Sequence, residues 1–283
     1  MSVAPDQSRT VSLVEAAAEL GVHYMTAYRY VRTGRLAAEL DGHEWRVRLD
    51  DLESFRSPRQ TPVRSAPQGR APRLVDRLIA GDETGAWRII EDALAGGSSP
   101  TDIHLDLLAP ALRRVGEGWR VGRVSVADEH RASATARRLV ARLGPQFSRP
   151  GRKRGTIVVG AVAGEWHDIP AALVADQLRG AGYAVVELGA NTPATSFAET
   201  AQQEHPVAVL ISVTTPGLDG AVRDATDAVR ATGVPVVVGG SAVTSARVAR
   251  SLGSDEWAGR DARDVVALVE RLRQDHASRR RST

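Results

Sequence analysis

The sequence contains no cysteine, which excludes disulfide bonds and thiolate metal sites. It also lacks an apolar run long enough to span a membrane and the basic-then-apolar start of a signal peptide. We therefore expect a cytoplasmic protein with no membrane partner. Lysine is nearly missing as well, because Lys153 is the only one, and arginine carries the basic charge. The net charge of +3 is too small to indicate nucleic acid by itself.

Composition divides the 283 residues into segments. A proline-rich stretch, SPRQTPVRSAPQGRAP, is typical of a flexible linker. The segments before and after this stretch have the apolar periodicity of helices. A short basic segment with two glycines then follows, and after it short apolar strands alternate with helices. The predicted organisation is a DNA-binding domain at 1–56, a linker at 57–72, a four-helix bundle at 73–150, an α/β domain at 151–276 and a disordered basic tail at 277–283.

The first segment has the order of a helix-turn-helix. Ser12 and Glu15 form a capping box that predicts a helix through Leu20, and Gly21 predicts a tight turn before a second helix. The second helix carries side chains suited to phosphates and base edges, namely Tyr24, Thr26, Tyr28, Arg29 and Arg32.

A hairpin follows these two helices. Asp41-Gly42 lies between two extended runs and predicts a two-residue turn. Arg46 and Arg48 on the returning strand are placed to reach a nucleic-acid backbone or minor groove. The alternative is a small helical domain with solvated arginines.

The sequence SLVEAAAELGVHYMTAYRYVRTGRLAAELDGHEWRVRLDDLESF resembles the winged helix-turn-helix of the MerR and excisionase families. The resemblance implies that double-stranded operator DNA is a partner.

The last domain is predicted from four apolar runs, TIVVGAVA, YAVVELG, VAVLISVT and VPVVVGG, which alternate with helices. Apolar strands without polar alternation indicate a parallel sheet covered on both faces. We predict a doubly wound, flavodoxin-like sheet of five strands, with ligands at the carboxyl ends of the strands. The absence of GxGxxG argues against a dinucleotide, and the absence of an acidic cluster argues against a phosphoacceptor domain.

The loops at these strand ends read GEWHDIP, SVTTPG and VGGSAVT. In this order they resemble the cobalamin-binding domain of methionine synthase and the corrinoid proteins. The resemblance implies that His167 is the lower axial ligand of cobalt, that Glu165 binds its other nitrogen and that Ser212 extends the relay. Further expected contacts with the cofactor come from Thr214, Gly239 and Gly240, the glycines leaving space for its nucleotide tail. Two departures from the family pattern are Glu165 in place of aspartate and Pro170 in place of glycine.

The middle domain carries a second motif. Trp119 is followed after nine residues by Glu129 and His130, on helices predicted from their apolar periodicity. This spacing resembles that of the CarH/LitR-type cobalamin photoreceptors, in which the bundle caps adenosylcobalamin. The resemblance places all three side chains near the adenosyl group. Arg120 stands where the best-understood relatives have a histidine that captures cobalt, and a protonated guanidinium cannot do so.

The three domains together predict a non-enzymatic, adenosylcobalamin-dependent transcriptional regulator, light-responsive, with operator DNA and further copies of itself as partners. Two alternatives stay open. A corrinoid carrier or methyltransferase module gives no reason for the helix-turn-helix. A cobalamin-independent regulator with another ligand is favoured by Glu165 and Pro170.

Overall fold

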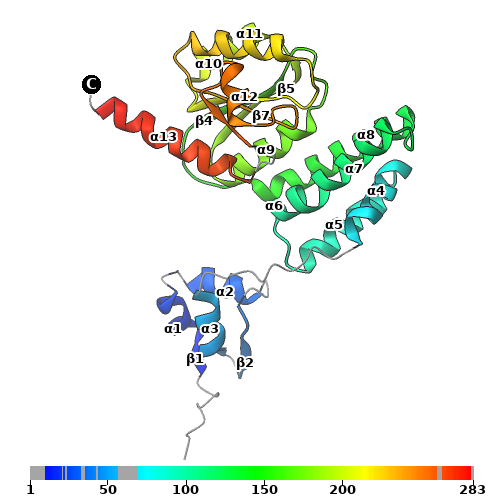
Figure 1. Cartoon of the computed structure of the whole chain (residues 1–283). Helices are drawn as coiled ribbons and strands as arrows, with labels where there is room; N and C mark the ends of the chain where they lie inside the picture. Colours follow the sequence, from blue (N-terminus) through cyan, green and yellow to red (C-terminus); the bar gives the residue numbers. More distant parts are fainter. Residues whose placement is uncertain are drawn as a thin grey trace, which may run out of the picture. The chain divides into compact units, whose positions relative to one another are not determined.

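The computed structural model describes residues 10–20, 22, 24–32, 36–42, 44–56, 69–259 and 263–281. Of these, the side chains of Thr26, Arg29, Arg32, Ser54, Arg56 and residues 276–281 lie outside the description. The chain forms two compact units, one within residues 1–65 and the other within residues 66–283 (Figure 1). Each is described by itself.

The first unit combines short helices with an antiparallel sheet. Its elements are β1 (Thr10–Ser12), α1 (Leu13–Glu19), α2 (Tyr24–Arg32), β2 (Glu39–Asp41), β3 (Glu44–Arg48) and α3 (Leu49–Arg56). The predicted capping box is present, because the Ser12 hydroxyl accepts from the Glu15 amide and the Ser12 amide donates to the Glu15 carboxylate. The hairpin forms the predicted wing, and β1 adds a third strand in the order β1-β3-β2.

The second unit begins with a helical bundle. It consists of α4 (Arg70–Ala80), α5 (Glu83–Ala95), α6 (Pro100–Asp102), η1 (Ile103–Leu108), α7 (Ala109–Arg120), α8 (Val126–Leu143) and η2 (Gly144–Phe147). The segments from α6 to α7 form one continuous helical run of the predicted bundle, but η1 within it is a π-helical segment. Pro110, the second residue of α7, has no amide hydrogen to donate to the preceding turn.

A parallel sheet follows the bundle. Its elements are β4 (Thr156–Val162), α9 (Ile169–Gly180), β5 (Ala184–Thr192), α10 (Ala194–Glu204), β6 (Ala208–Ser212), α11 (Asp219–Arg230), β7 (Val236–Gly239), α12 (Ala246–Ser251), β8 (Glu256–Trp257) and α13 (Val265–Arg281). The strand order β5-β4-β6-β7-β8 confirms the flavodoxin-like prediction. Since β4 lies beside β6, the loops at their carboxyl ends meet at one edge of the sheet.

Two boundaries differ from the sequence-based expectation. Helix α13 continues to Arg281, although a disordered tail was expected from residue 277, because alanine and arginine sustain a helix well. Helix α4 begins at Arg70, inside the expected linker, whose residues 57–68 lie outside the described part. No helix in the described residues is long and apolar enough to cross a membrane.

The bundle and helix α9 of the α/β domain share one hydrophobic core. Leu139, Leu143 and Phe147 from the end of the bundle belong to the same buried cluster as Ile169 and Leu173 of α9. Figure 1 shows α9 between the sheet and the bundle. The bundle is therefore fixed against the edge of the sheet where the loops after β4 and β6 lie.

Shortening Leu139 tests this shared core. Leu139 is fully buried on α8, so we expect Leu139→Ala to lower the free energy of unfolding of the second unit by ~2–5 kcal/mol. The control is Arg138→Ala on the same helix, which removes only an exposed ion pair with Glu83 and should cost at most about 1 kcal/mol. Urea denaturation followed by circular dichroism measures both. Equal losses for the two variants would show that Leu139 is not in the core.

Candidate functional site

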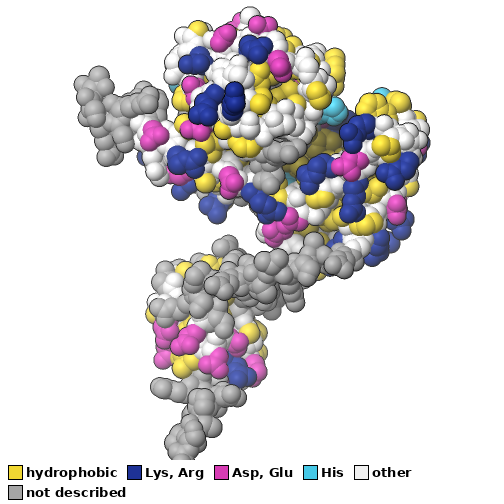
Figure 2. Space-filling model, in the orientation of Figure 1, with side chains coloured by type: hydrophobic (Ala, Val, Ile, Leu, Met, Phe, Trp, Pro, Cys, Tyr) yellow, Lys and Arg dark blue, Asp and Glu magenta, His cyan; other side chains and the backbone are white. Residues whose placement is uncertain are grey.

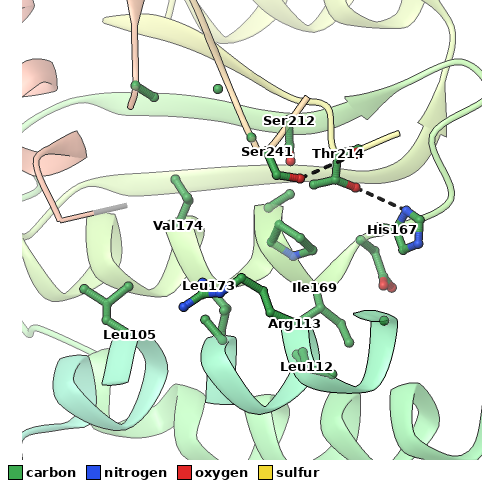
Figure 3. Close-up of a pocket in the computed structure, with 18 of the residues that line it drawn as sticks. Leu105, Leu112, Arg113, His167, Ile169, Leu173, Val174, Ser212, Thr214 and Ser241 are labelled. Atoms are coloured by element: carbon green, nitrogen blue, oxygen red, sulfur yellow. Dashed lines mark hydrogen bonds between the residues drawn. The ribbon is translucent and has the colours of Figure 1, made fainter. Parts of the chain in front are cut away.

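A cavity of about 930 Å³ lies between the bundle and the carboxyl edge of the sheet. The η1, α7 and α8 segments line one side, and the loops after β4, β6 and β7 line the other. Figure 2 shows the hollow between these two parts of the second unit, and Figure 3 shows side chains that reach into it from both. Its size is at the upper end of the ~300–1,000 Å³ typical of small-molecule sites.

His167 and Glu165 form the polar centre of this site. Glu165 is completely buried, whereas the His167 side chain is 61% exposed and lines the cavity. The His167 Nδ1 atom lies 2.6 Å from Glu165 Oε1, and the His167 amide donates to the same oxygen at 3.0 Å. Because Nδ1 is occupied by the carboxylate, Nε2 is the ring nitrogen left for a metal.

The loop after β6 supplies the other bonds to Glu165. The Thr214 and Thr215 amides donate to Oε2 at 2.6 and 2.7 Å. Both hydroxyls donate to the same carboxylate at 3.0 Å. Figure 3 shows Thr214 beside His167, at 3.2 Å from its Nδ1 atom. The carboxylate therefore ties the histidine loop to the neighbouring strand.

The end of β5 fixes the same loop from its other side. The Asn191 side-chain oxygen accepts from the Gly164 amide at 2.8 Å, and the Asn191 amide donates to the Glu165 carbonyl at 2.8 Å. Asn191 does this with a left-handed backbone, at a φ of 52°.

These contacts set the charges of the pair. Burial alone would raise the pKa of Glu165, but hydrogen bonds from His167 and from the Thr214 and Thr215 amides hold that pKa far below its usual range. The bond to Glu165 raises the pKa of His167 above 6.5, against the opposing effect of burial. A metal at Nε2 competes with a proton for this ring, so its binding weakens as the pH falls through the raised pKa.

Two glycines at the end of β7, Gly239 and Gly240, allow neighbouring segments of the chain to approach closely. Gly240 has a φ of 109°, and a Cβ atom there would lie 2.2 Å from the Val213 carbonyl oxygen. A Cβ atom on Gly239 would meet Ala258 at 2.8 Å. Both glycines line the cavity, as does Ser241, whose hydroxyl donates to the Thr214 carbonyl at 3.4 Å.

The structure brings only part of the predicted set into the cavity. The lining includes Glu129, His167, Ser212, Thr214, Gly239 and Gly240. The hydrogen bonds to Glu165 described for this loop come from Thr214 and Thr215, so the hydroxyl expected from Ser212 is supplied by its neighbours. Thr215 is not among the predicted site residues, although SVTTPG offers three hydroxyls within four residues.

The bundle side of the cavity is lined by other side chains than the sequence predicts. Trp119 is 52% exposed and His130 is 75% exposed in its side chain, and neither lines the cavity. The α7 and α8 side chains that do line it include Arg113, Arg120 and Arg137. Val115, one turn earlier on α7, is buried and lines the cavity, whereas Trp119 is the second-last residue of that helix and lies beyond the cavity wall.

The predicted DNA-contacting residues lie in the first unit. Tyr24 and Tyr28 stack on α2 with their ring centroids 6.3 Å apart. Arg46 on β3 pairs with Glu44 at 2.9 Å, and Arg48 is exposed on the same strand. The side chains of Thr26, Arg29 and Arg32 lie outside the described residues.

The side chains around the cavity fit a metal ion that has one protein ligand and whose other ligands belong to a macrocyclic cofactor. Within the described residues there is no group of three or more histidine, cysteine, aspartate or glutamate side chains that could hold a metal ion. Metal sites built from protein alone usually need three or four such ligands. A single, carboxylate-oriented histidine suffices when a corrin ring supplies the equatorial nitrogens.

Comparisons with known protein families agree with this geometry. Residues 71–143 and 155–268 each match a family model described as a B12 binding domain. Residues 10–59 match a model described as a helix-turn-helix domain.

Several curated relatives resemble the second unit. The trimethylamine corrinoid protein 1 of Methanosarcina acetivorans is 27% identical over 209 residues, 69% of this chain and 92% of the relative. The methionine synthase of Mycobacterium leprae is also 27% identical over 209 residues, which are only 17% of that longer protein. The structure of the Methanosarcina barkeri monomethylamine corrinoid protein matches 72% of this chain and 99% of its own at a TM-score of 0.62 and 21% identity, which shows the shared fold. Together these relatives support a corrinoid cofactor.

The same relatives overturn the expected function. They are corrinoid proteins and methionine synthases, so the prediction of a light-responsive transcriptional regulator is wrong, and the alternative of a corrinoid carrier agrees better with them. The expected partners, operator DNA and further copies of this chain, are corrected with it, because the helix-turn-helix match alone gives them only weak support.

Replacing Glu165 tests the electrostatics of the site. We expect Glu165→Gln to lower the pKa of His167 in the cofactor-free protein toward or below 6.5, because the raising effect of the carboxylate is lost while burial remains. The matched control is Glu129→Gln, since Glu129 raises the same pKa only through space, and its removal should give a smaller drop. The measurement is an NMR titration of the His167 ring protons, assigned by their loss in His167→Ala. Equal shifts in the two variants would contradict the assignment.

Proposed function

We propose that residues 69–281 form a corrinoid carrier, which holds the cofactor through His167 and presents it to a methyltransferase. The observation that supports this most directly is the buried Glu165 carboxylate 2.6 Å from Nδ1 of His167, at the edge of a cavity of about 930 Å³. When bound, the corrinoid supplies a cobalt ion that takes up and releases a methyl group.

In this proposal His167 binds cobalt through Nε2. Glu165 keeps the proton on Nδ1 and directs the Nε2 lone pair toward the metal, as carboxylates do for histidine ligands in other metal sites. The Thr214 and Thr215 amides hold the carboxylate in its charged state, so the imidazole is oriented before the cofactor binds.

The departures from the family pattern are compatible with this role. Glu165 is longer than aspartate by one methylene group, yet it still contacts His167 and the amides of the loop after β6. Pro170 lies in the first turn of α9, where its missing amide hydrogen has no helical partner to lose. Neither substitution therefore removes a contact that the lower ligand needs.

The bundle forms the other wall of the site. Leu105 and Leu112 face the cavity from η1 and α7, and Leu173 faces it from α9 (Figure 3). Apolar side chains at these positions exclude water from the cofactor. Charged groups line the cavity from the bundle side as well, Arg113 and Glu129 among them, and the Arg113 side chain is exposed to solvent.

The partner in this proposal is a methyltransferase, which performs the chemistry on the methyl donor and acceptor. The relatives include a trimethylamine corrinoid protein, a dimethylamine corrinoid protein and a methionine synthase, and these names support this class of partner. We infer a methyl group as the working upper ligand. The prediction of adenosylcobalamin has less support, because Trp119 and His130, which were expected near the adenosyl group, do not line the cavity.

Removal of the ligand tests the proposed function. We expect His167→Ala to lower the affinity for hydroxocobalamin at least tenfold, or about 1.4 kcal/mol, and to abolish the spectrum of histidine-bound cobalt. The matched control is His130→Ala, whose side chain is 75% exposed and outside the cavity, and which should bind as the wild type does. Spectrophotometric titration of the full chain measures both.

Two outcomes would contradict the proposal. One is wild-type protein that binds no corrinoid. The other is a His167→Ala variant with the wild-type affinity and spectrum. The same titration with methylcobalamin and with adenosylcobalamin compares the two upper ligands, and the carrier proposal expects the methyl form to bind at least as well.

A further inference from the structure

One ion pair joins the bundle to the loop that carries the proposed cobalt ligand. Arg137 Nε on α8 donates to both Asp168 oxygens at 2.9 Å. Asp168 directly follows His167 and immediately precedes α9. The contact therefore links a residue of the bundle to the residue next to the ligand.

Among the described residues, the Asp168 side chain forms hydrogen bonds and an ion pair with Arg137 alone. At the start of α9 its side chain makes no capping hydrogen bond to the helix, unlike Ser125 before α8 or Asp82 before α5. Its orientation toward α8 is thus better explained by Arg137 than by the local helix start.

The pair also separates two cavities. Arg137, Asp168 and Ile169 line both the main cavity and a second one of about 430 Å³ on the other side. The second cavity contains further charges, but Arg179 pairs there with Asp176 at 3.2 Å and Glu187 at 2.5 Å. The pair between Arg137 and Asp168 is therefore part of the wall behind the histidine loop.

We propose that Arg137 is a positioning residue for the lower ligand: by holding Asp168, it fixes the backbone that presents His167 to cobalt. This rests on the proposed function, and it adds that coordination by His167 depends on the bundle being in place against the α/β domain. Arg137 touches neither the metal nor the imidazole in this account, and it acts through the chain.

The test uses the full-length protein loaded with methylcobalamin. An alkyl group weakens the bond opposite to it, so the balance between histidine-bound and histidine-free cobalt responds to small changes. We expect Arg137→Ala to lower the ratio of the histidine-bound to the histidine-free form about two- to fivefold, the range of a partly exposed ion pair. Arg137→Lys keeps a positive charge and should restore part of the ratio.

Arg138→Ala is the matched control. Arg138 is the next residue on the same helix, with a similar exposure, and its ion pair with Glu83 stays inside the bundle. It should leave the ratio unchanged, while both alanine variants unfold at similar temperatures. The ratio is read from the absorption spectrum of the bound methylcobalamin. A separate sample of each variant, loaded with cob(II)alamin, shows by the nitrogen hyperfine splitting of its EPR spectrum whether a nitrogen ligand is bound.

The outcomes separate this inference from the proposed function. Wild-type protein that binds no corrinoid overturns both. If all variants bind the cofactor and Arg137→Ala has the wild-type ratio, the inference alone is overturned. An equal fall in Arg137→Ala and Arg138→Ala also overturns it, because the effect then comes from the helix and not from the contact with Asp168.

Discussion

The site depends on keeping a charged carboxylate inside the protein. Transfer of a carboxylate from water into an interior costs several kcal/mol unless hydrogen bonds replace its hydration. Glu165 is completely buried, and it obtains these bonds from His167 and from the loop after β6. That supply is possible only because β4 and β6 are neighbours in a parallel sheet whose loops meet at one edge. The hydrogen bonds that the buried Glu165 carboxylate requires thus fix the loop after β4, the loop after β6 and the orientation of the His167 imidazole.

Much of this could be predicted from sequence, because its determinants are local or periodic. Apolar runs of strand length separated by helices define the flavodoxin-like sheet, and the rule for such sheets places ligands at the carboxyl ends of the strands. Glu165 and His167 are two residues apart, so their pairing depends on a single turn. The capping box of Ser12 and Glu15 likewise involves one helical turn, and the structure contains it.

The rest depends on geometry that the sequence does not encode locally. Which hydroxyl of SVTTPG turns back to Glu165 is decided by the path of the loop, and Thr215 takes part where Ser212 was expected. Trp119 lies at the end of α7 and is exposed although its spacing to Glu129 matched a known motif, because spacing along the chain does not fix which way a side chain faces at a helix end. The helix-turn-helix and the short motif of Trp119, Glu129 and His130 favour a regulator, but a function belongs to a site and not to a combination of folds.

The central claim is that His167 coordinates cobalt while Glu165 holds its other nitrogen. A crystal structure of the protein with bound cobalamin tests it most directly. The account predicts cobalt bonded to Nε2 of His167, the cofactor's own benzimidazole base displaced from the metal, and Nδ1 still in contact with the Glu165 carboxylate. Cobalt bonded to its own base, with His167 turned away from the corrin ring, would contradict the account.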